Sequence, residues 1–437
     1  MQLLRVLMVT AVSLVLAGAV SAETIFVAAD GSGDYPTIQA ALDASVEGDQ
    51  IQIGPGLFEE NIVVPDRAIL IRGTLADDGT HETILDGRGL TTVVLFDYFT
   101  PVQNVLRDLV ITNGGGVLNG GGIEVRRATP TVINCVITGN NVAEEGSGVY
   151  VWETGNLTMV SCRIVGNNSG GEGAGLSCRQ SGNVTMINCE VSGNYAEIGG
   201  AGLEIDTASA SLLGTEISQN ITPGQGGGLW IKSSAPVLDS CTIWGNQSLA
   251  GAGVYCFNSS EPVFENCVIA NNSSKGGIGG GICNLSQKVA PILSGTLVCG
   301  NVPSQFYGDW IDGGQNGVSD EPCLGIGLCC TGNDIRCARL DSEMDCLMIG
   351  GQWVPDGTSC FDCPLIVESN GACCVAGLCV EVSEQECEDL DGIFSGDGVA
   401  CLYSECVISC FGDATYDGVV DVNDILLVIA RFGVTCP

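Results

Sequence analysis

The strongest constraint on the fold of this chain is a repeat of 26 to 29 residues that recurs eight times between residues 108 and 301. Each copy has a Cys or small polar residue, an aliphatic residue two positions later and an Asn three positions after that, as in Cys162, Ile164 and Asn167. A second motif, Gly-x-Gly followed by an aliphatic residue, has the same period and ends at Gly122, Gly148, Gly175, Gly202, Gly228, Gly253 and Gly281. Two motifs that share one period indicate repeated structural units.

Each repeat has the pattern of short β-strands. Apolar residues alternate with period two, and no run of 3.6-residue periodicity is long enough for a helix, which argues against ankyrin, tetratricopeptide and leucine-rich repeats. Three strands and three bends account for one repeat, and equivalent strands of successive coils would pair about 4.8 Å apart. We therefore predict an all-β fold, a right-handed parallel β-helix of at least eight coils, because left-handed hexapeptide helices have shorter coils.

Stacked coils place equivalent residues in ladders. The predicted inward aliphatic ladder consists of Ile137, Ile164, Val191, Ile217, Ile243 and Ile269. The Cys two positions earlier has the same parity, so we expect it to point inward as a small apolar residue, with disulfides between neighbouring coils as an open alternative. We expect the Asn ladder at a bend, where Asn tolerates the left-handed region and can bond its own backbone or its stacked neighbour.

These motifs resemble a known family. Residues 25 to about 310 resemble the secreted right-handed parallel β-helix proteins of the pectate-lyase-like superfamily, which have coils of the form Gly-Gly-[Gly/Ala]-[Ile/Leu] and Asn-Cys-x-Ile-x-x-Asn. The segment from Phe26 to Leu42 is similar to their N-terminal cap, in which a strand leads into a short amphipathic helix that covers the first coil. The superfamily contains lyases, hydrolases, esterases, adhesins and inactive binders, so the resemblance implies the fold more strongly than an activity.

The sequence outside the repeats predicts a secreted protein. Residues 1–22 have a basic residue, an apolar stretch and a small-residue cleavage site, as a signal peptide does, and no later segment is long and apolar enough to span a membrane. The formal net charge of -36 excludes nucleic acid as a default partner and suits calcium binding or an extracellular medium. We assign residues 23–107 to the cap and first coils, 108–310 to the repeats and 311–322 to a linker.

Fifteen of the 24 cysteines follow this linker. One spacing pattern occurs twice, which divides residues 323–368 and 369–407 into two Cys-rich modules. In a secreted chain this density predicts small domains held by disulfides, although their connectivity does not follow from the sequence. Zinc is the alternative, but the only His, His81, is distant in sequence and the Cys spacing differs from that of paired zinc knuckles.

Residues 408–437 contain the most specific chemical motif. It resembles one calcium loop of a type I dockerin, with Gly418 at the sharp turn and a following helix at 425–431. The predicted Ca²⁺ ligands are the side chains of Asp413, Thr415, Asp417, Asp421 and Asp424 and the backbone carbonyl of Val419. Thr at the second of these positions replaces the usual Asn or Asp, and a dockerin has two such loops, so binding of a cohesin-like partner is less well supported than calcium binding. An acidic loop that caps a helix is the alternative.

The strand after each Gly-x-Gly carries the candidate ligand site. Its first outward row is Glu124, Tyr150, Ser177, Glu204, Trp230 and Tyr255. Its second outward row is Arg126, Trp152, Arg179, Asp206, Lys232 and Phe257. In the lyases and hydrolases of the superfamily, this face carries the saccharide groove. Flat aromatic rings suit sugar faces, whereas a ladder of salt bridges and stacked rings is the purely structural alternative.

Two functions therefore remain open. We expect a secreted protein that binds extracellular polysaccharide or acts as a cell-surface adhesion protein, and that is attached to a partner through its calcium-binding, dockerin-like tail. The alternative is a polysaccharide lyase or glycosidase acting on an acidic plant or algal polysaccharide, with Glu204, Asp206, Arg179 and Lys232 as the catalytic candidates. Catalysis has weaker support because the coils carry no long insertions and no extended motif of a known lyase or esterase is present.

Overall fold

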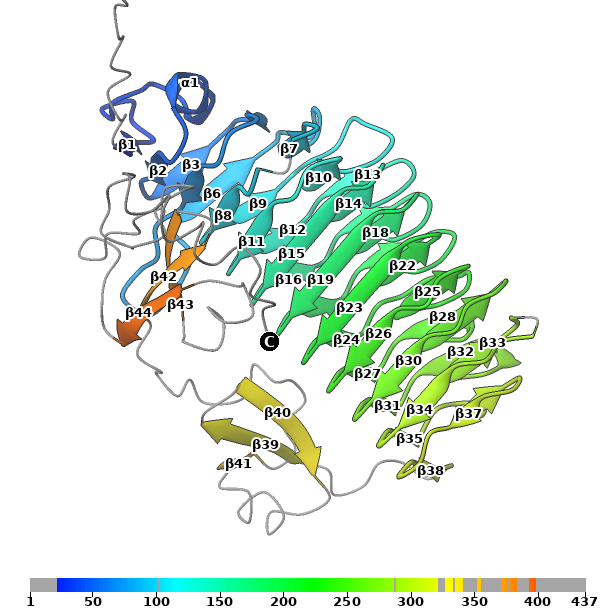
Figure 1. Cartoon of the computed structure of the whole chain (residues 1–437). Coiled ribbons are helices and arrows are strands. Elements are labelled where there is room, and N and C mark those ends of the chain that lie inside the picture. The colour runs from blue at the N-terminus through cyan, green and yellow to red at the C-terminus, as the bar shows by residue number, and fades with distance from the viewer. Residues whose placement is uncertain are drawn as a thin grey trace, which may run out of the picture.

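The computed structural model describes residues 22–100, 102–286 and 288–320, together with the backbone of six short strands between residues 327 and 397. From Thr24 to Ser319 the chain winds through successive coils of a parallel β-helix, so that strands far apart in sequence lie side by side (Figure 1). The predicted all-β solenoid is thus confirmed.

Three parallel sheets form the walls of this β-helix. Sheet A consists of β1 (Thr24–Val27), β2 (Gln50–Ile53), β5 (Leu70–Arg72), β8 (Val105–Arg107), β11 (Thr131–Ile133), β15 (Asn156–Val160), β19 (Asn183–Ile187), β23 (Ser209–Leu213), β26 (Val237–Asp239), β30 (Val263–Glu265), β34 (Ile292–Ser294) and β37 (Ile311–Asp312). Sheet B consists of β3 (Gly56–Phe58), β6 (Thr83–Asp86), β9 (Val110–Thr112), β12 (Val136–Thr138), β16 (Arg163–Val165), β20 (Glu190–Ser192), β24 (Glu216–Ser218), β27 (Thr242–Trp244), β31 (Val268–Ala270), β35 (Leu297–Cys299) and β38 (Gly317–Ser319). Sheet C consists of β4 (Ile62–Val64), β7 (Val94–Asp97), β10 (Ile123–Arg126), β14 (Val149–Trp152), β18 (Leu176–Arg179), β22 (Leu203–Asp206), β25 (Leu229–Lys232), β29 (Val254–Phe257), β33 (Ile282–Asn284) and β36 (Phe306–Tyr307).

The aliphatic ladder lies inside the coils, as predicted. Its six members pair in register across sheet B, for example Ile164 with Val191 and Ile217 with Ile243. All six side chains are fully buried in one continuous core. Parallel pairing without register shifts keeps this parity from coil to coil, because a one-residue slip would turn every side chain of a strand to the opposite face.

The Asn ladder is held by hydrogen bonds between coils. The Asn220 Nδ2 donates to the Val191 carbonyl at 2.9 Å and to Oδ1 of Asn246 at 3.0 Å, and Asn194 bonds Asn220 in the same way. Bonding to the stacked neighbour is thus confirmed. In most copies the Asn itself does not adopt the left-handed conformation. The residue directly before it has the positive φ instead, as at Gly139 and Gly166.

The cysteines of the coils are buried, as expected for small apolar residues. Eight are free thiols: Cys135, Cys162, Cys178, Cys189, Cys241, Cys256, Cys267 and Cys283. In the Cys162 copy the Sγ lies 3.3 Å from the carbonyls of Val160 and Val132, which gives the thiol backbone acceptors inside the core. Burial raises the pKa of Cys135 to about 12, so this thiol is neutral at physiological pH. Cys299, in contrast, forms a disulfide.

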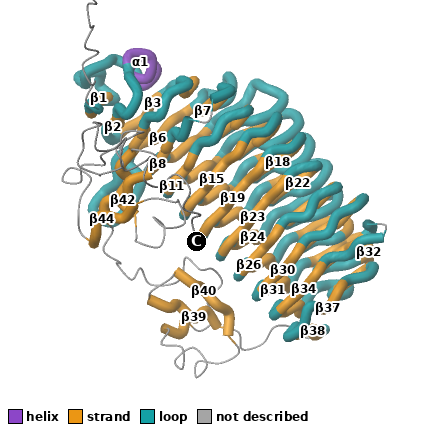
Figure 2. Tube along the Cα trace, viewed as in Figure 1, coloured by secondary structure: helices purple, strands orange, loops and turns teal. Residues whose placement is uncertain are grey.

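Helix α1 (Ile38–Ala44) covers the N-terminal end of the β-helix (Figure 2). The Thr37 side chain accepts a hydrogen bond from the backbone of Ala40, and Ile38, Ala41 and Leu42 are buried against the first strands. Ser/Thr caps of this kind satisfy N–H groups that a helix leaves unpaired at its start. The cap therefore covers a strand edge that would otherwise be open to pairing.

The β-helix extends beyond its predicted C-terminal end. Residues 311–322 were expected to form a linker, but β37 pairs with β34 and β38 pairs with β35, so residues up to Ser319 belong to a last coil. This coil is shorter than the others and lacks the Cys and Gly-x-Gly motifs, which explains why the repeat pattern missed it.

Smaller strands occur outside the three walls. At the bend before sheet C lie β13 (Asn141–Val142), β17 (Asn168–Ser169), β21 (Tyr195–Ala196), β28 (Gln247–Ala250) and β32 (Ser273–Ile278). The two Cys-rich regions contain β39 (Gly327–Gly332), β40 (Ile335–Leu340) and β41 (Gln352–Val354), then β42 (Gly371–Val375), β43 (Leu378–Val382) and β44 (Ile393–Asp397). Each set is antiparallel with its first strand in the centre, so the duplicated Cys spacing corresponds to a duplicated strand order.

Among the described residues, no helix has both the length and the apolar character needed to cross a membrane. The signal peptide assigned to residues 1–22 lies almost entirely outside the described part of the chain.

Candidate functional site

The outer face of sheet C brings together the residues that the sequence analysis selected. Successive strands pair in register, so that Glu204 lies beside Ser177 and Trp230 in the first outward row. In the second row Asp206 lies between Arg179 and Lys232. We call the outward residues of β10, β14, β18, β22, β25 and β29 the sheet C strip. Because parallel strands repeat about every 4.8 Å, the strip is an elongated surface of regularly spaced side chains.

The two rows of the strip differ in burial because a turn covers the first. Tyr150, Ser177 and Glu204 are at most 5% exposed although they point away from the core. The first glycine of each Gly-x-Gly has a positive φ and lies directly against them; a Cβ built on Gly173 would meet the Cβ of Ser177 at 2.6 Å. A side chain at that position would be both strained and blocked. In the middle of the strip Arg179 and Asp206 of the second row are therefore the residues that reach solvent, whereas Lys232 is buried and, nearer the two ends, Glu124 and Trp230 of the first row are partly exposed.

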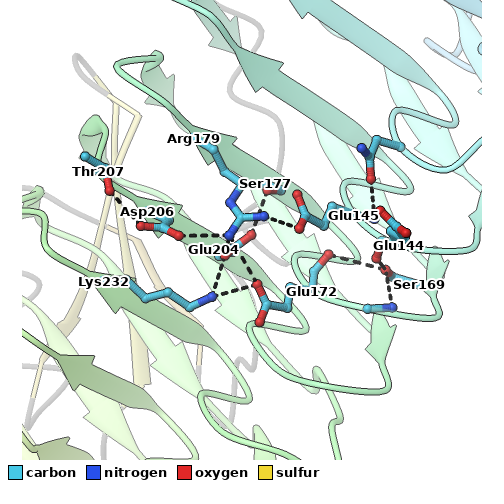
Figure 3. Close-up of polar contacts among 12 residues, drawn as sticks. Glu144, Glu145, Ser169, Glu172, Ser177, Arg179, Glu204, Asp206, Thr207 and Lys232 are labelled. Carbon is cyan, nitrogen blue, oxygen red and sulfur yellow. Dashed lines mark hydrogen bonds and ion pairs between the residues drawn. The ribbon is translucent and has the colours of Figure 1, made fainter.

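The centre of the strip is a cluster of charged residues, shown in Figure 3. Its members, which we call the central cluster, are Glu145, Glu172, Arg179, Glu204, Asp206 and Lys232. The Lys232 ammonium is 2.8 Å from Glu204 and 2.6 Å from Glu172, and the Arg179 guanidinium is 2.8 Å from Asp206. Ser177 donates a hydrogen bond of 2.7 Å to the second oxygen of Glu204.

Two carboxylates of the central cluster were not identified from the sequence. Glu145 pairs with Arg179, and Glu172 contacts both cations of the cluster. Both come from the turn before sheet C and stack one coil apart, since the amide of Gly146 donates to the Glu172 carbonyl. A signal was present in the sequence, because each Glu directly precedes the Gly-x-Gly of its coil. The path by which that turn folds back over the strip could not be inferred from the repeat.

The environment of the central cluster separates the pKa values of its two strand carboxyls. Burial raises the pKa of Glu204 to about 7, although Lys232 acts to lower it. Burial also acts to raise the pKa of Asp206, but hydrogen bonds from Arg179 and Thr207 outweigh this effect and the pKa is lowered. Asp206 is therefore ionised at neutral pH, whereas Glu204 takes up a proton near neutrality.

A second group of charges lies toward the N-terminal end of the strip, and we call it the Arg126 cluster. Its members are Asp97, Glu124, Arg126, Arg127, Trp152 and Glu153. Arg126 lies 2.8 Å from Glu153 and 3.5 Å from Asp97, and its guanidinium is 4.5 Å from the centre of the Trp152 ring. The indole of Trp152 donates to Glu124 at 2.9 Å. Burial raises the pKa of Glu124 and outweighs the lowering effect of this hydrogen bond.

The C-terminal end of the strip is aromatic. Trp230 packs edge-on against Tyr255, with ring centres 6.0 Å apart, and Tyr255 stacks on Phe257 at 6.5 Å. The Lys232 ammonium lies 3.8 Å from the centre of the Trp230 ring. Trp230 fits because Gly199 leaves space, since a Cβ there would come within 2.3 Å of the indole. Phe257 is 41% exposed, whereas Tyr255 is buried.

No group of three or more His, Cys, Asp or Glu in the described residues is arranged to hold a metal ion. Most carboxylates of the two clusters are paired with Arg or Lys, and Glu124 accepts a hydrogen bond from Trp152. The predicted calcium loop, with Asp413, Thr415, Asp417, Val419, Asp421 and Asp424, lies outside the described residues.

The sequence matches the family described as right handed beta helix region over residues 97–221 and 170–319, which together span more than half of the chain. The protein therefore belongs to this family, and the predicted handedness of the coil is confirmed. A search of curated proteins returned no match.

Several solved structures are similar to this chain. Pectate lyase Pel9A has 12% identity and a TM-score of 0.40, covering 69% of this chain and 79% of that one. ORF18 of Geobacillus virus E2 has 13% identity and a TM-score of 0.40, covering 70% and 62%. The tailspike gp49 of Acinetobacter baumannii bacteriophage Fri1, a capsular polysaccharide depolymerase, has 11% identity and a TM-score of 0.32, covering 68% and 62%. At these identities the similarity concerns the fold alone.

Proposed function

We propose that this protein binds extracellular polysaccharide along the sheet C strip. The observation that carries the proposal is the strip itself, in which aromatic rings at both ends flank a fixed group of hydrogen-bonding charges. Trp152 lies at one end, and Trp230 and Phe257 lie at the other. A straight, regularly spaced surface suits an extended polymer better than a compact metabolite, and aromatic rings offer flat apolar area to sugar faces.

The rigidity of the support favours this function. Every strip residue stands on a strand that is paired with neighbours on both sides and whose inward residues are fully buried. Side chains held in this way lose little freedom when a ligand binds, which reduces the entropic cost of association. The ion pairs of the central cluster restrict the side chains further.

A second function, polysaccharide cleavage, has one specific observation in its favour. Glu204 and Asp206 have pKa values pushed in opposite directions, a pattern that acid–base enzymes use to assign their proton donor and their ionised group. Glu204, however, is fully buried beneath the turn that contains Gly200, so its carboxyl does not reach the surface where a polymer would lie. We therefore place binding ahead of catalysis.

The C-terminal residues of the chain have a separate proposed function. We propose that residues 408–437 bind Ca²⁺ and attach the secreted protein to a cohesin-like or other cell-surface protein. This part is supported by the loop spacing alone. Calorimetry on the full chain should show calcium uptake at millimolar concentration that is lost in Asp417→Ala, and equal uptake by both proteins would contradict the site.

A panel of neutral and charged polysaccharides tests the main proposal, with bound polymer and released product scored together. The wild-type protein should retain at least one polymer without product release, and the Trp152→Ala/Trp230→Ala double variant should lose it. Trp244→Ala is the matched control, because this Trp stands on β27 of sheet B, away from the strip. Binding to the double variant equal to that of wild type would exclude the strip as the binding surface.

A further inference from the structure

The cations of the sheet C strip are already paired with carboxylates. Lys232 is shared between Glu172 and Glu204, and its ammonium also faces the ring of Trp230. Its side chain is 11% exposed, so little of the charge reaches solvent. Arg179 pairs with Asp206 at 2.8 Å and with Glu145, and lies 3.6 Å from Glu204.

The Arg126 cluster has the same property. Arg126 and Arg127 are both held by Asp97 and Glu153. Across the two clusters, four cations face seven carboxyl groups, namely Asp97, Glu124, Glu145, Glu153, Glu172, Glu204 and Asp206. Even with Glu124 and Glu204 protonated, the remaining five carboxylates outnumber the cations.

This excess determines which ligand groups the strip can accept. A uronate carboxylate can only accept hydrogen bonds, so it would need a cation with few partners on the protein. Each cation of the strip would have to break an ion pair with a protein carboxylate before it could bind a uronate. Sugar hydroxyls, in contrast, donate to carboxylates in strong charge-assisted hydrogen bonds. The side chain of Asp206 is 23% exposed and that of Glu145 is 17% exposed, so both can accept such bonds. The formal net charge of -36 adds a general repulsion toward polyanions.

We infer that the ligand of the sheet C strip is an uncharged polysaccharide that donates hydroxyl hydrogen bonds to the strip carboxylates and stacks on its tryptophans. This inference rests on the proposed function and narrows it. It departs from the acidic polysaccharide that the sequence alone suggested for an enzyme.

The first experiment compares three probes on the intact protein: hydroxyethylcellulose as the neutral polymer, polygalacturonate as the polyanion and chitosan as the polycation. Hydroxyethylcellulose should bind, with an affinity that changes less than about twofold between low and high salt, because no net charge is exchanged. Polygalacturonate should not bind. If polygalacturonate or chitosan is the preferred probe and its binding is lost in Trp152→Ala/Trp230→Ala, the ligand class is wrong while the proposed function stands.

A gain-of-function variant tests the charge argument separately. Glu172→Gln/Asp206→Asn removes two carboxylates that occupy Arg179 and Lys232 and leaves the buried Glu204 unchanged. We expect this variant to bind polygalacturonate at low salt at least about tenfold more tightly than the weakest affinity the assay can detect, whereas the wild type shows no binding, and we expect this binding to be lost at high salt. Glu261→Gln/Glu265→Gln changes the net charge equally at exposed positions away from the strip and should show no such gain. An equal gain in both proteins, or none in either, would overturn the inference.

Failure of the proposed function gives a different result. If neither the three probes nor the wider polysaccharide panel binds the wild-type protein or Glu172→Gln/Asp206→Asn, the proposed function itself is wrong. Circular dichroism of each variant shows whether its β-structure is intact, so that loss of binding is assigned to the strip only in folded protein.

Discussion

The interior of the coils and the outer face of sheet C are built from the same strands but follow different rules. On β22, Leu203 and Ile205 point into the core, whereas Glu204 and Asp206 point outward. The inward positions remain apolar in every coil from β10 to β29, while the outward positions change among acidic, basic, aromatic and small residues. Close packing restricts the size and polarity of side chains inside a stacked coil. The outer face has no such restriction and can form a ligand-binding surface.

The largest effect should come from the interior. Ile217→Ala removes a fully buried side chain that is stacked between Val191 and Ile243, so the free energy of unfolding should fall by about 2–5 kcal/mol. Ile221→Ala is the matched control, because Ile221 is 41% exposed and should change stability by roughly 0.5 kcal/mol or less. Denaturant unfolding of the three proteins measures both values, and equal losses would contradict the inward ladder.

The next effect depends on pH and distinguishes a buried outward residue from an exposed one. The unfolded chain releases the Glu204 proton near its ordinary pKa of 4.5, whereas the folded protein holds it until about pH 7. Stability should therefore fall as pH rises from 4.5 to 7, by about 3 kcal/mol in total. In Glu204→Gln this fall should be absent, so the difference in unfolding free energy between the variant and wild type should change with pH across that window. A difference that is constant between pH 5 and 8 would show that Glu204 is ionised throughout.

A smaller effect should appear at an exposed position of the strip. Phe257→Ala should weaken binding of the best polymer by about 1 kcal/mol, because the ring is 41% exposed at the C-terminal end of the strip and is not a central anchor. The same substitution should change the unfolding free energy by roughly 0.5 kcal/mol or less. Calorimetry and denaturant unfolding of one preparation measure both, and a large loss of stability without loss of affinity would make Phe257 structural.

The interior was predictable from sequence because its rules are local. Alternation with period two gives the parity of Ile164, and one period shared by two motifs gives the stacking, so the ladder and the coil follow directly. The last coil, with β37 and β38, was missed because it forms the same pairs without the motifs.

The strip was predictable only in part. Register gives the two outward rows, so Arg179, Asp206 and Lys232 were correctly expected to be neighbours on one face. The burial of Glu204 and the contact of Glu172 with Lys232 both depend on how the Gly-x-Gly turn folds over the strand. Nothing in the sequence repeat specifies the path of that turn. Residues beneath a turn therefore have to be located in three dimensions before a role is assigned to them.

Binding along the sheet C strip is tested most directly by the dissociation constant of the best-binding polymer for Trp152→Ala/Trp230→Ala compared with that for Trp244→Ala, with the free energy of unfolding of each variant measured. The affinity of the double variant should be at least tenfold weaker, since each aromatic anchor contributes on the order of 1–3 kcal/mol, in protein that retains the β-helix. Trp244→Ala should bind like the wild type. Full affinity in the double variant would contradict polysaccharide binding on the strip, because the outer face of sheet C would then be a structural ladder like the interior.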